Sequence, residues 1–85
     1  MLVTNGVYRH FKGGLYILET VARHHEMDEL WVVYRSFETK ERYVRPKDMF
    51  TELVDKEKYP YVRQKERFKF IGVAYDMDNE GKEYN

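Results

Sequence analysis

Two adjacent glycines, Gly13 and Gly14, separate two runs of strand-forming residues and limit how the start of the chain can fold. A glycine-rich loop that binds phosphate lies between a strand and a helix, because the amides of the helix point at the anion. Here a second strand-like run follows the glycines. The sequence therefore predicts a β-hairpin, in which glycine supplies the positive φ angles that a tight turn needs.

The rest of the apolar pattern is also short and strand-like. Three consecutive antiparallel strands are predicted from runs rich in β-branched and aromatic residues, at residues 7–11, 15–24 and 30–37. Pro46, followed by apolar residues at helical spacing, predicts one short helix near residues 47–53. Residues 61–75 predict one or two more strands. We expect a mainly β fold made of one strongly bent antiparallel sheet of five or six strands.

Length and composition indicate one small domain. The chain has 85 residues, and we expect a single β domain over residues 1–75 and a flexible acidic tail over 76–85. It has no cysteine, which excludes a disulfide framework and suits the reducing cytoplasm. The pattern of a signal peptide or a membrane span is missing, so we expect a cytoplasmic monomer without membrane contact. Fifteen acidic and fifteen basic side chains cancel, which removes the usual electrostatic signature of duplex binding.

The expected turns predict which residues face each other. If the glycine pair forms the centre of a two-residue turn, Tyr8 faces Glu19, and a loop over residues 25–29 places Glu19 opposite Arg35. One face of such a sheet would form the core, and the other would mix charged and aromatic side chains. Glu19 and Arg35 are expected to form a surface ion pair. The candidate binding residues on the mixed face and beside it are Tyr8, His10, Glu19, Trp31, Arg35 and Arg45.

Four motifs in the first fifty positions resemble a bacterial domain family of unknown function. They are YRHFKGGLY at residues 8–16, AxHxE at residues 22–26, VVYR at residues 32–35 and VRPxxMF at residues 44–50. The family is small and mostly β, so the resemblance implies a small SH3-like antiparallel barrel. It implies no catalytic or binding residue, because none is assigned in the family. The chain departs from the family pattern between Glu26 and Trp31, and the resemblance does not extend beyond Tyr59.

A few polar residues are of the types that bind metals or act as acids and bases. His10, His24, His25 and Glu26 are zinc-type ligands, but adjacent residues of a strand point to opposite faces, which separates them. The tail sequence DMDNEG resembles the start of a calcium loop, but the chain ends before the glutamate that completes such a loop. We therefore expect no metal and no other cofactor. His24 and Glu26 could still form an acid–base pair, which leaves a small hydrolase as a second alternative function.

Aromatic residues point to binding. The chain has eight Tyr, five Phe and one Trp, residue types that are enriched in recognition surfaces. Small five-stranded barrels bind peptides or single-stranded nucleic acid through aromatic side chains on an open face. We expect a binding or adaptor domain for a protein or peptide partner. Single-stranded nucleic acid, RNA in particular, is the alternative, which the neutral net charge disfavours. The aromatic residues could also serve only to stabilise the sheet.

Overall fold

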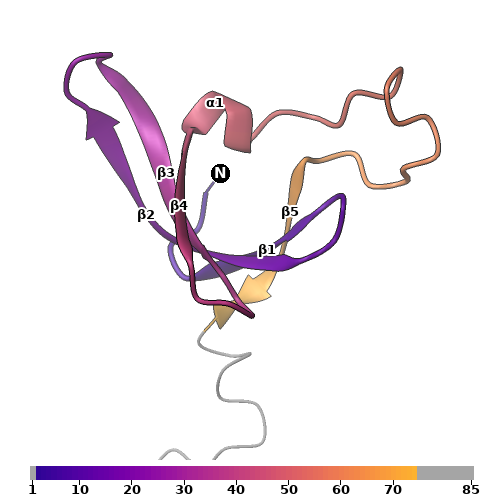
Figure 1. Ribbon diagram of the computed structural model, residues 1–85, viewed down its shortest axis with the longest axis horizontal. Helices are drawn as coiled ribbons and strands as arrows, with labels where there is room; N and C mark the ends of the chain where they lie inside the picture. Colours follow the sequence, from indigo (N-terminus) through magenta and orange to yellow (C-terminus); the bar gives the residue numbers. More distant parts are fainter. Residues whose placement is uncertain (1, 75–85) are drawn as a thin grey trace, which may run out of the picture.

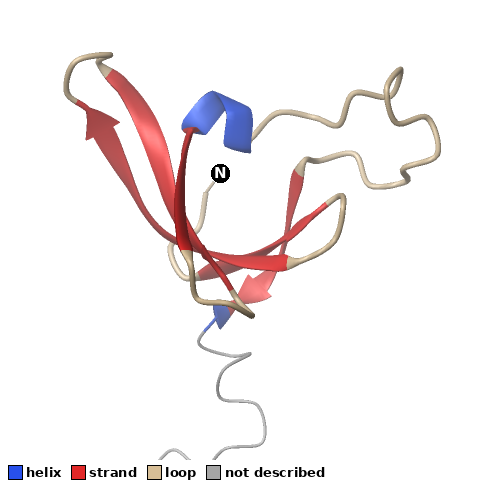
Figure 2. Ribbon diagram, in the orientation of Figure 1, coloured by secondary structure: helices blue, strands red, loops and turns tan. Residues whose placement is uncertain are grey.

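The computed structural model describes residues 2–74 and shows a mainly β domain with one short helix (Figure 1, Figure 2). The elements in chain order are β1 (Gly6–His10), β2 (Leu15–His24), β3 (Glu29–Ser36), β4 (Arg42–Pro46), α1 (Lys47–Phe50) and β5 (Phe68–Val73). The five strands form one antiparallel sheet, in the order β4-β3-β2-β1-β5. This confirms the predicted mainly β fold. The tail predicted over residues 76–85 lies outside the described residues.

The sheet is open and does not close into the expected barrel. β4 and β5 stand at the two ends of the strand order and do not pair with each other within residues 2–74. β4 is a short edge strand, and it ends at Pro46, which has no backbone N–H to donate to a further strand. Figure 1 shows the β2–β3 hairpin and the β1–β2 hairpin extending in different directions, as in a strongly bent sheet.

The hairpin predicted at the glycine pair is present, with a longer loop than expected. Four residues, 11–14, connect β1 to β2, and both glycines adopt positive φ angles, 106° at Gly13 and 88° at Gly14. The longer loop shifts the register by an odd number of residues, so that Tyr8 pairs with Tyr16 rather than with Glu19. Because alternate residues face opposite sides of a sheet, this shift moves the side chain of Tyr8 to the other face.

A β-bulge at Glu19 divides the β2–β3 ladder into two parts. Leu18 pairs with Tyr34, whereas Thr20 pairs with Val33, so the register shifts between Leu18 and Thr20. A bulge inserts one extra residue into one strand and increases the local twist and bend of the sheet. Compared with the expected pairing of Glu19 with Arg35, the observed register is displaced by two residues near Tyr34, which preserves the faces, and by one residue toward the β2–β3 turn, which exchanges them.

Helix α1 is a single turn, shorter than the predicted helix over residues 47–53. Pro46 precedes it, as predicted, and Phe50 is its buried residue. The hydroxyl of Thr51 donates to the carbonyl of Lys47 at 3.0 Å, a bond that competes with helix propagation. Leu53 then leaves the helix and forms an isolated β-bridge with Glu66, and its side chain is 69% exposed. The apolar residues after Phe50, which had predicted a longer helix, therefore belong to a segment that runs beside the chain just before β5.

The core lies on both faces of the sheet. On the side where α1 packs, which we call the helix face, the buried residues are Tyr8, Leu18, Val32, Tyr34, Phe50 and Phe68. A second, smaller cluster consists of Val7, Ile17 and Ala74. Val7 and Tyr8 are neighbours in β1, so their side chains point to opposite faces. The bent sheet thus buries apolar side chains on both sides, although a chain of this size can fill only a small core.

The long connection between α1 and β5 is held by polar contacts to its own backbone and to the hairpin. The ammonium of Lys56 donates to the carbonyl of Gln64 at 3.0 Å and also to the carbonyl of Val62. The side-chain amide of Gln64 donates to the carbonyl of Arg9 in β1 at 2.9 Å.

Across residues 2–74, the structure contains no helix that is both long enough and apolar enough to cross a membrane.

Candidate binding site

The structure separates the six predicted binding residues into four groups. The groups are Tyr8, the pair Glu19 and Arg35, Trp31, and the pair His10 and Arg45. Tyr8 is 3% exposed and belongs to the core, where its ring packs edge-on against Phe50 at a centroid distance of 5.3 Å. Its hydroxyl accepts a hydrogen bond from the backbone N–H of Val3 at 2.9 Å. Tyr8 is therefore buried in the core, whereas the predicted two-residue turn had placed it on the mixed face.

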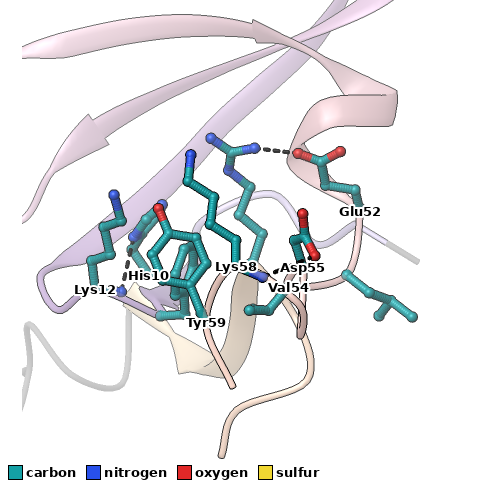
Figure 3. A pocket seen from close by; sticks show the side chains of 10 residues that line it. His10, Lys12, Glu52, Val54, Asp55, Lys58 and Tyr59 are labelled. Carbon is teal, nitrogen blue, oxygen red and sulfur yellow. Dashed lines mark hydrogen bonds and ion pairs between the residues drawn. The ribbon is translucent and has the colours of Figure 1, made fainter. Parts of the chain in front are cut away.

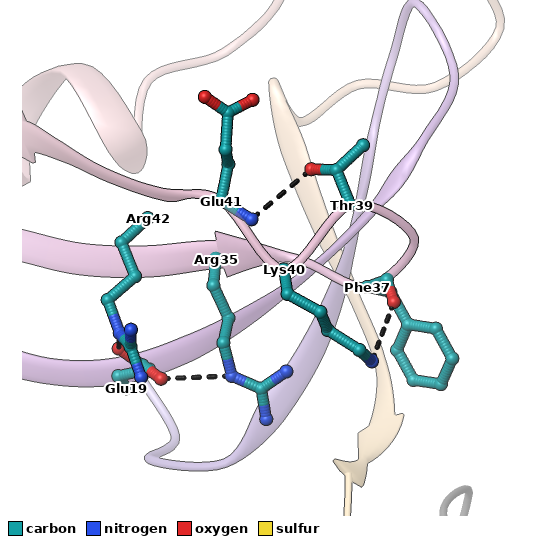
Figure 4. Close-up of polar contacts among 7 residues, drawn as sticks. All are labelled: Glu19, Arg35, Phe37, Thr39, Lys40, Glu41 and Arg42. Carbon is teal, nitrogen blue, oxygen red and sulfur yellow. Dashed lines mark hydrogen bonds and ion pairs between the residues drawn. The ribbon is translucent and has the colours of Figure 1, made fainter.

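Glu19 joins three strands through its carboxylate. Oε2 accepts a hydrogen bond from Nε of Arg35 at 2.9 Å, and Oε1 accepts one from Nε of Arg42 at 2.8 Å (Figure 4). The predicted ion pair between Glu19 and Arg35 is therefore present. Hydrogen bonding from Arg42 and Arg35 lowers the pKa of Glu19 against the opposing effect of desolvation. Both oxygens of the carboxylate are thus engaged by arginines, and the cluster keeps one net positive charge.

Trp31 lies toward the outer end of the β2–β3 hairpin, away from the other candidates. Its indole N–H donates to Oε1 of Glu29 at 3.1 Å, and its ring is 5.2 Å from that of His24. Nδ1 of His24 accepts the backbone N–H of Met27 at 3.2 Å, so this histidine stabilises the turn that follows β2. A shallow apolar hollow is formed there by Ala22, Arg23, His24, Trp31, Val33 and Val44.

His10 and Arg45 are the two predicted residues that meet in a cleft. This cleft, which we call the aromatic cleft, has a volume of about 240 Å³ and is lined by His10, Tyr16, Tyr34, Tyr43, Arg45 and Phe68. Nε of Arg45 donates to the hydroxyl of Tyr34 at 3.2 Å, and its guanidinium lies 5.8 Å from the centre of the Phe68 ring. Arg45 is therefore fixed above aromatic surface, a favourable cation–π arrangement.

The aromatic rings of the cleft contact one another at right angles or tilted angles. Tyr16 lies 5.6 Å from Tyr34 and 6.3 Å from Tyr43, and both contacts are edge-on. The hydroxyl of Tyr43 donates to the carboxylate of Glu41 at 3.3 Å, and the Tyr43 side chain is 40% exposed. Such edge-on pairs stabilise the sheet, and because Tyr34 and Phe68 are only 4% and 6% exposed, the accessible aromatic surface of the cleft comes mainly from Tyr16 and Tyr43.

His10 closes one end of the aromatic cleft in its neutral form. Its ring packs edge-on against Phe68 at 4.8 Å, and Nδ1 accepts the backbone N–H of Lys12 at 3.1 Å. Burial lowers the pKa of His10, and the positive charges of Arg67, Arg45 and Lys12 lower it further. Because Nδ1 is an acceptor, the proton of the neutral ring is on Nε2, which can donate to a ligand.

A second pocket lies on the other side of His10, between the β1–β2 loop and the connection that follows α1 (Figure 3). Its volume is about 310 Å³, and its lining residues are His10, Phe11, Lys12, Glu52, Leu53, Val54, Asp55, Lys58, Tyr59 and Arg67. We call it the loop pocket. His10 lines both hollows.

The histidines and acids do not form a metal site in the described part of the chain. Among residues 2–74, no group of three His, Cys, Asp or Glu side chains is placed to hold a metal ion. The tail sequence DMDNEG lies outside these residues. Glu26, the proposed partner of His24 in acid–base chemistry, is exposed in the β2–β3 turn and does not line the hollow that His24 borders.

Four residues of the aromatic cleft were not chosen from the sequence: Tyr16, Tyr34, Tyr43 and Phe68. Phe68 comes from the part of the chain where no motif was recognised, and it reaches the cleft because β5 returns beside β1. One sequence signal could have pointed to this cleft: Tyr34 and Tyr43 lie on successive strands, where they are cross-strand partners.

The fold and the cleft define a small all-β domain, in which an open five-stranded sheet carries an aromatic cleft near a single helical turn. The chain belongs to the family described as "Protein of unknown function (DUF1653)", whose sequence pattern matches residues 6–70. This agrees with the resemblance to a family of unknown function. No curated protein matches the chain.

A solved relative supports the fold. The crystal structure of a DUF1653 protein from Bordetella bronchiseptica is similar, with 31% sequence identity and a TM-score of 0.67. The similarity covers 84% of this chain and 90% of that chain. It extends the agreement beyond sequence motifs to the arrangement of the strands, and its description assigns no activity.

Proposed function

We propose that the domain is a binding module that recognises a protein or peptide segment through the aromatic cleft. The observation that supports this proposal is an open hollow in which Tyr16 and Tyr43 lie over the buried rings of Tyr34 and Phe68, with Arg45 and His10 also lining it. Tyr and Arg dominate the energetics of protein interfaces, because they combine a large contact area with hydrogen-bonding groups. A peptide side chain or proline ring can pack on the rings, while its backbone carbonyls accept from Arg45 or from Nε2 of His10.

The openness of the cleft favours binding over catalysis. Its volume of about 240 Å³ is below the usual range for a small-molecule pocket, about 300–1,000 Å³. The hydrolase alternative at His24 and Glu26 is weaker, because Nδ1 of His24 is already occupied by the backbone of Met27. An acid–base pair also needs a site that positions the substrate.

Single-stranded nucleic acid is the second candidate for the same cleft. Stacked aromatic rings next to Arg45 are the elements that such proteins use. The formal net charge of zero disfavours it, because phosphate contacts supply most of the affinity for nucleic acid. We therefore place a peptide first, and the test includes an oligonucleotide.

The test compares two tyrosines that differ in position. Tyr43→Ala removes a ring from the cleft, whereas Tyr61→Ala removes a 95% exposed ring that lines none of the hollows described above. Peptides selected from a random peptide library and a single-stranded oligonucleotide are each titrated into the labelled protein. We expect peptide-induced NMR shifts at Tyr16, Tyr34 and Phe68, and about tenfold weaker binding for Tyr43→Ala only. Shifts centred elsewhere, or equal losses in both variants, would refute the proposal.

The SH3-like fold class, the bacterial origin, the cytoplasmic location and the monomeric state are also proposals. We propose that the open sheet belongs to the SH3-like type, because β5 returns to pair with β1 after a helical turn that follows β4. We further propose a bacterial, cytoplasmic monomer, which is consistent with a chain that has no cysteine. Sedimentation that gives the mass of two chains at micromolar concentration would contradict the monomer.

A further inference from the structure

The loop pocket contains two lysines that converge on one tyrosine. The ring of Tyr59 packs edge-on against Phe11 at 4.9 Å, which fixes it against the β1–β2 loop. Nζ of Lys12 lies 5.1 Å from the centre of the Tyr59 ring, and Nζ of Lys58 lies 5.6 Å from it. In Figure 3 both ammonium groups lie on the same side of the pocket as the hydroxyl of Tyr59. Two segments far apart in sequence thus bring their donors together.

Two other charged residues of the loop pocket pair with each other, and Asp55 keeps its negative charge while it is hydrogen-bonded to backbone amides. Nη1 of Arg67 is paired with the carboxylate of Glu52. Oδ1 of Asp55 accepts the backbone N–H groups of Glu57 and Lys58 at 3.0 and 3.3 Å. In contrast, neither Lys12 nor Lys58 forms an ion pair with a carboxylate within residues 2–74. The pocket therefore holds two cations without a carboxylate partner in the described structure.

Tyr59 responds to these two cations. Hydrogen bonding from Lys12 lowers the pKa of the Tyr59 hydroxyl, and the positive charges of Lys12 and Lys58 act in the same direction, against a smaller effect of desolvation. The local potential is thus positive at the point where the three side chains meet. A negatively charged group placed there would interact with both ammonium groups and accept from the hydroxyl.

We propose that Lys12, Lys58 and Tyr59 form a binding site for a phosphate monoester. Two unpaired ammonium groups match the charge of a phosphate dianion, whereas a single carboxylate would neutralise only one of them. Three donors on different side chains also suit a tetrahedral group with several acceptor oxygens. The site does not depend on the aromatic cleft, because neither lysine lines that cleft.

The experiment uses inorganic phosphate as the probe, titrated at constant ionic strength into the labelled full chain. We expect saturable NMR shifts at Lys12, Lys58 and Tyr59, and a rise in the pKa of Tyr59 when phosphate is bound. Lys12→Gln and Lys58→Gln should each weaken binding about tenfold. Tyr59→Phe keeps the ring and should weaken it about threefold.

Two controls separate this proposal from its alternatives. Lys69→Gln removes an exposed lysine of β5 that lies outside the loop pocket, and it should leave binding within twofold of the unaltered chain. Tyr43→Ala should also leave it unchanged, which distinguishes this site from the proposed peptide cleft. Non-saturable shifts, or equal losses in Lys69→Gln, would overturn the proposal.

Two organic phosphates then distinguish the sources of the group. O-phosphoserine represents a phosphorylated protein, and a nucleoside 5′-monophosphate represents a nucleotide. Binding of either with the same dependence on Lys12 and Lys58 supports the site and names its source, and binding of neither more tightly than chloride refutes it.

Discussion

The carboxylate of Glu19 in β2 accepts a hydrogen bond from Nε of Arg35 in β3 at 2.9 Å, although the two residues are not paired in the ladder. Glu19 lies at the bulge between Leu18 and Thr20, which leaves it unpaired and turns its side chain toward β4 as well, where Arg42 donates to the second oxygen. The bulge therefore allows one acidic residue to connect three strands.

This cluster predicts a dependence of stability on acid. The arginines hold the pKa of Glu19 below its ordinary value of 4.5, so the folded state favours the ionised form. The resulting stabilisation is present above that value and is lost as the pH falls through the lower pKa of the folded state. Glu19→Gln should cost about 0.5–1 kcal/mol at pH 7 and weaken the loss of stability on acidification. Urea unfolding at pH 7 and pH 3 measures both effects.

The control for Glu19 is Glu38→Gln, which changes an exposed residue outside the cluster. It should leave the midpoint of urea unfolding at pH 7 nearly unchanged. An equal loss for both variants at pH 7 would show that the arginine contacts of Glu19 contribute nothing specific.

Gly6 should not tolerate a side chain. A Cβ atom at this position would lie 2.7 Å from the carbonyl oxygen of Val3, which is backbone and also accepts the N–H of Gly6. Gly6→Ala should therefore destabilise the domain by about 1–3 kcal/mol, as overpacking does. In contrast, Gly13→Ala meets no atom within 4 Å and is disfavoured only by its φ of 106°. Thermal unfolding of both variants should show the larger loss for Gly6→Ala, and the reverse order would contradict this account.

Phe50 should contribute more to stability than any other residue of its helix. Its ring stacks on Phe68 at a centroid distance of 4.1 Å and is 1% exposed. Phe50→Ala should cost about 3–5 kcal/mol, whereas Leu53→Ala, at an exposed position, should change stability by less than about 0.5 kcal/mol. Chemical denaturation followed by circular dichroism measures the difference. Similar losses in the two variants would mean that Leu53 is buried in solution.

His10 should remain neutral at a pH where a free histidine is partly protonated. Burial and the charges of Arg67, Arg45 and Lys12 lower its pKa, so the unfolded chain binds the proton more readily. The contribution of His10 to stability is present above about pH 6.5 and decreases as the pH falls toward the lower pKa of the folded state. NMR titration of the imidazole measures this pKa, and Arg45→Gln should raise it. A pKa at or above 6.5 in the unaltered chain would contradict the prediction.

The sequence predicted where the strands begin and end better than which side of the sheet their side chains face. Local composition determines where strands form, so β1, β2 and β3 were placed to within one residue at each end. The side on which Tyr8 lies depends on the length of the turn, and a loop of four residues in place of two reversed it. β4 was not singled out, because its sequence RYVRP is short and ends in proline.

The candidate site was only partly predictable for the same reason. His10 and Arg45 were chosen for their residue types, and the structure brings them together through Phe68, which is distant in sequence. Tyr59 and Lys58 lie in a charged segment without periodicity, and their positions depend on how that segment returns to the β1–β2 loop. Patterns of apolar spacing contain no information on such long-range contacts.

The position of β1 between β2 and β5 affects how the chain can fold during synthesis. A ribosome releases β1 to β4 before β5, so the first four strands can assemble while one edge of β1 has no partner. Until residues 68–73 have emerged, that edge exposes backbone groups that can pair with another chain. A ribosome that stalls within the connection before β5 would therefore expose an unpaired strand edge that can aggregate with other chains. Chaperone contact during synthesis is most useful in this interval.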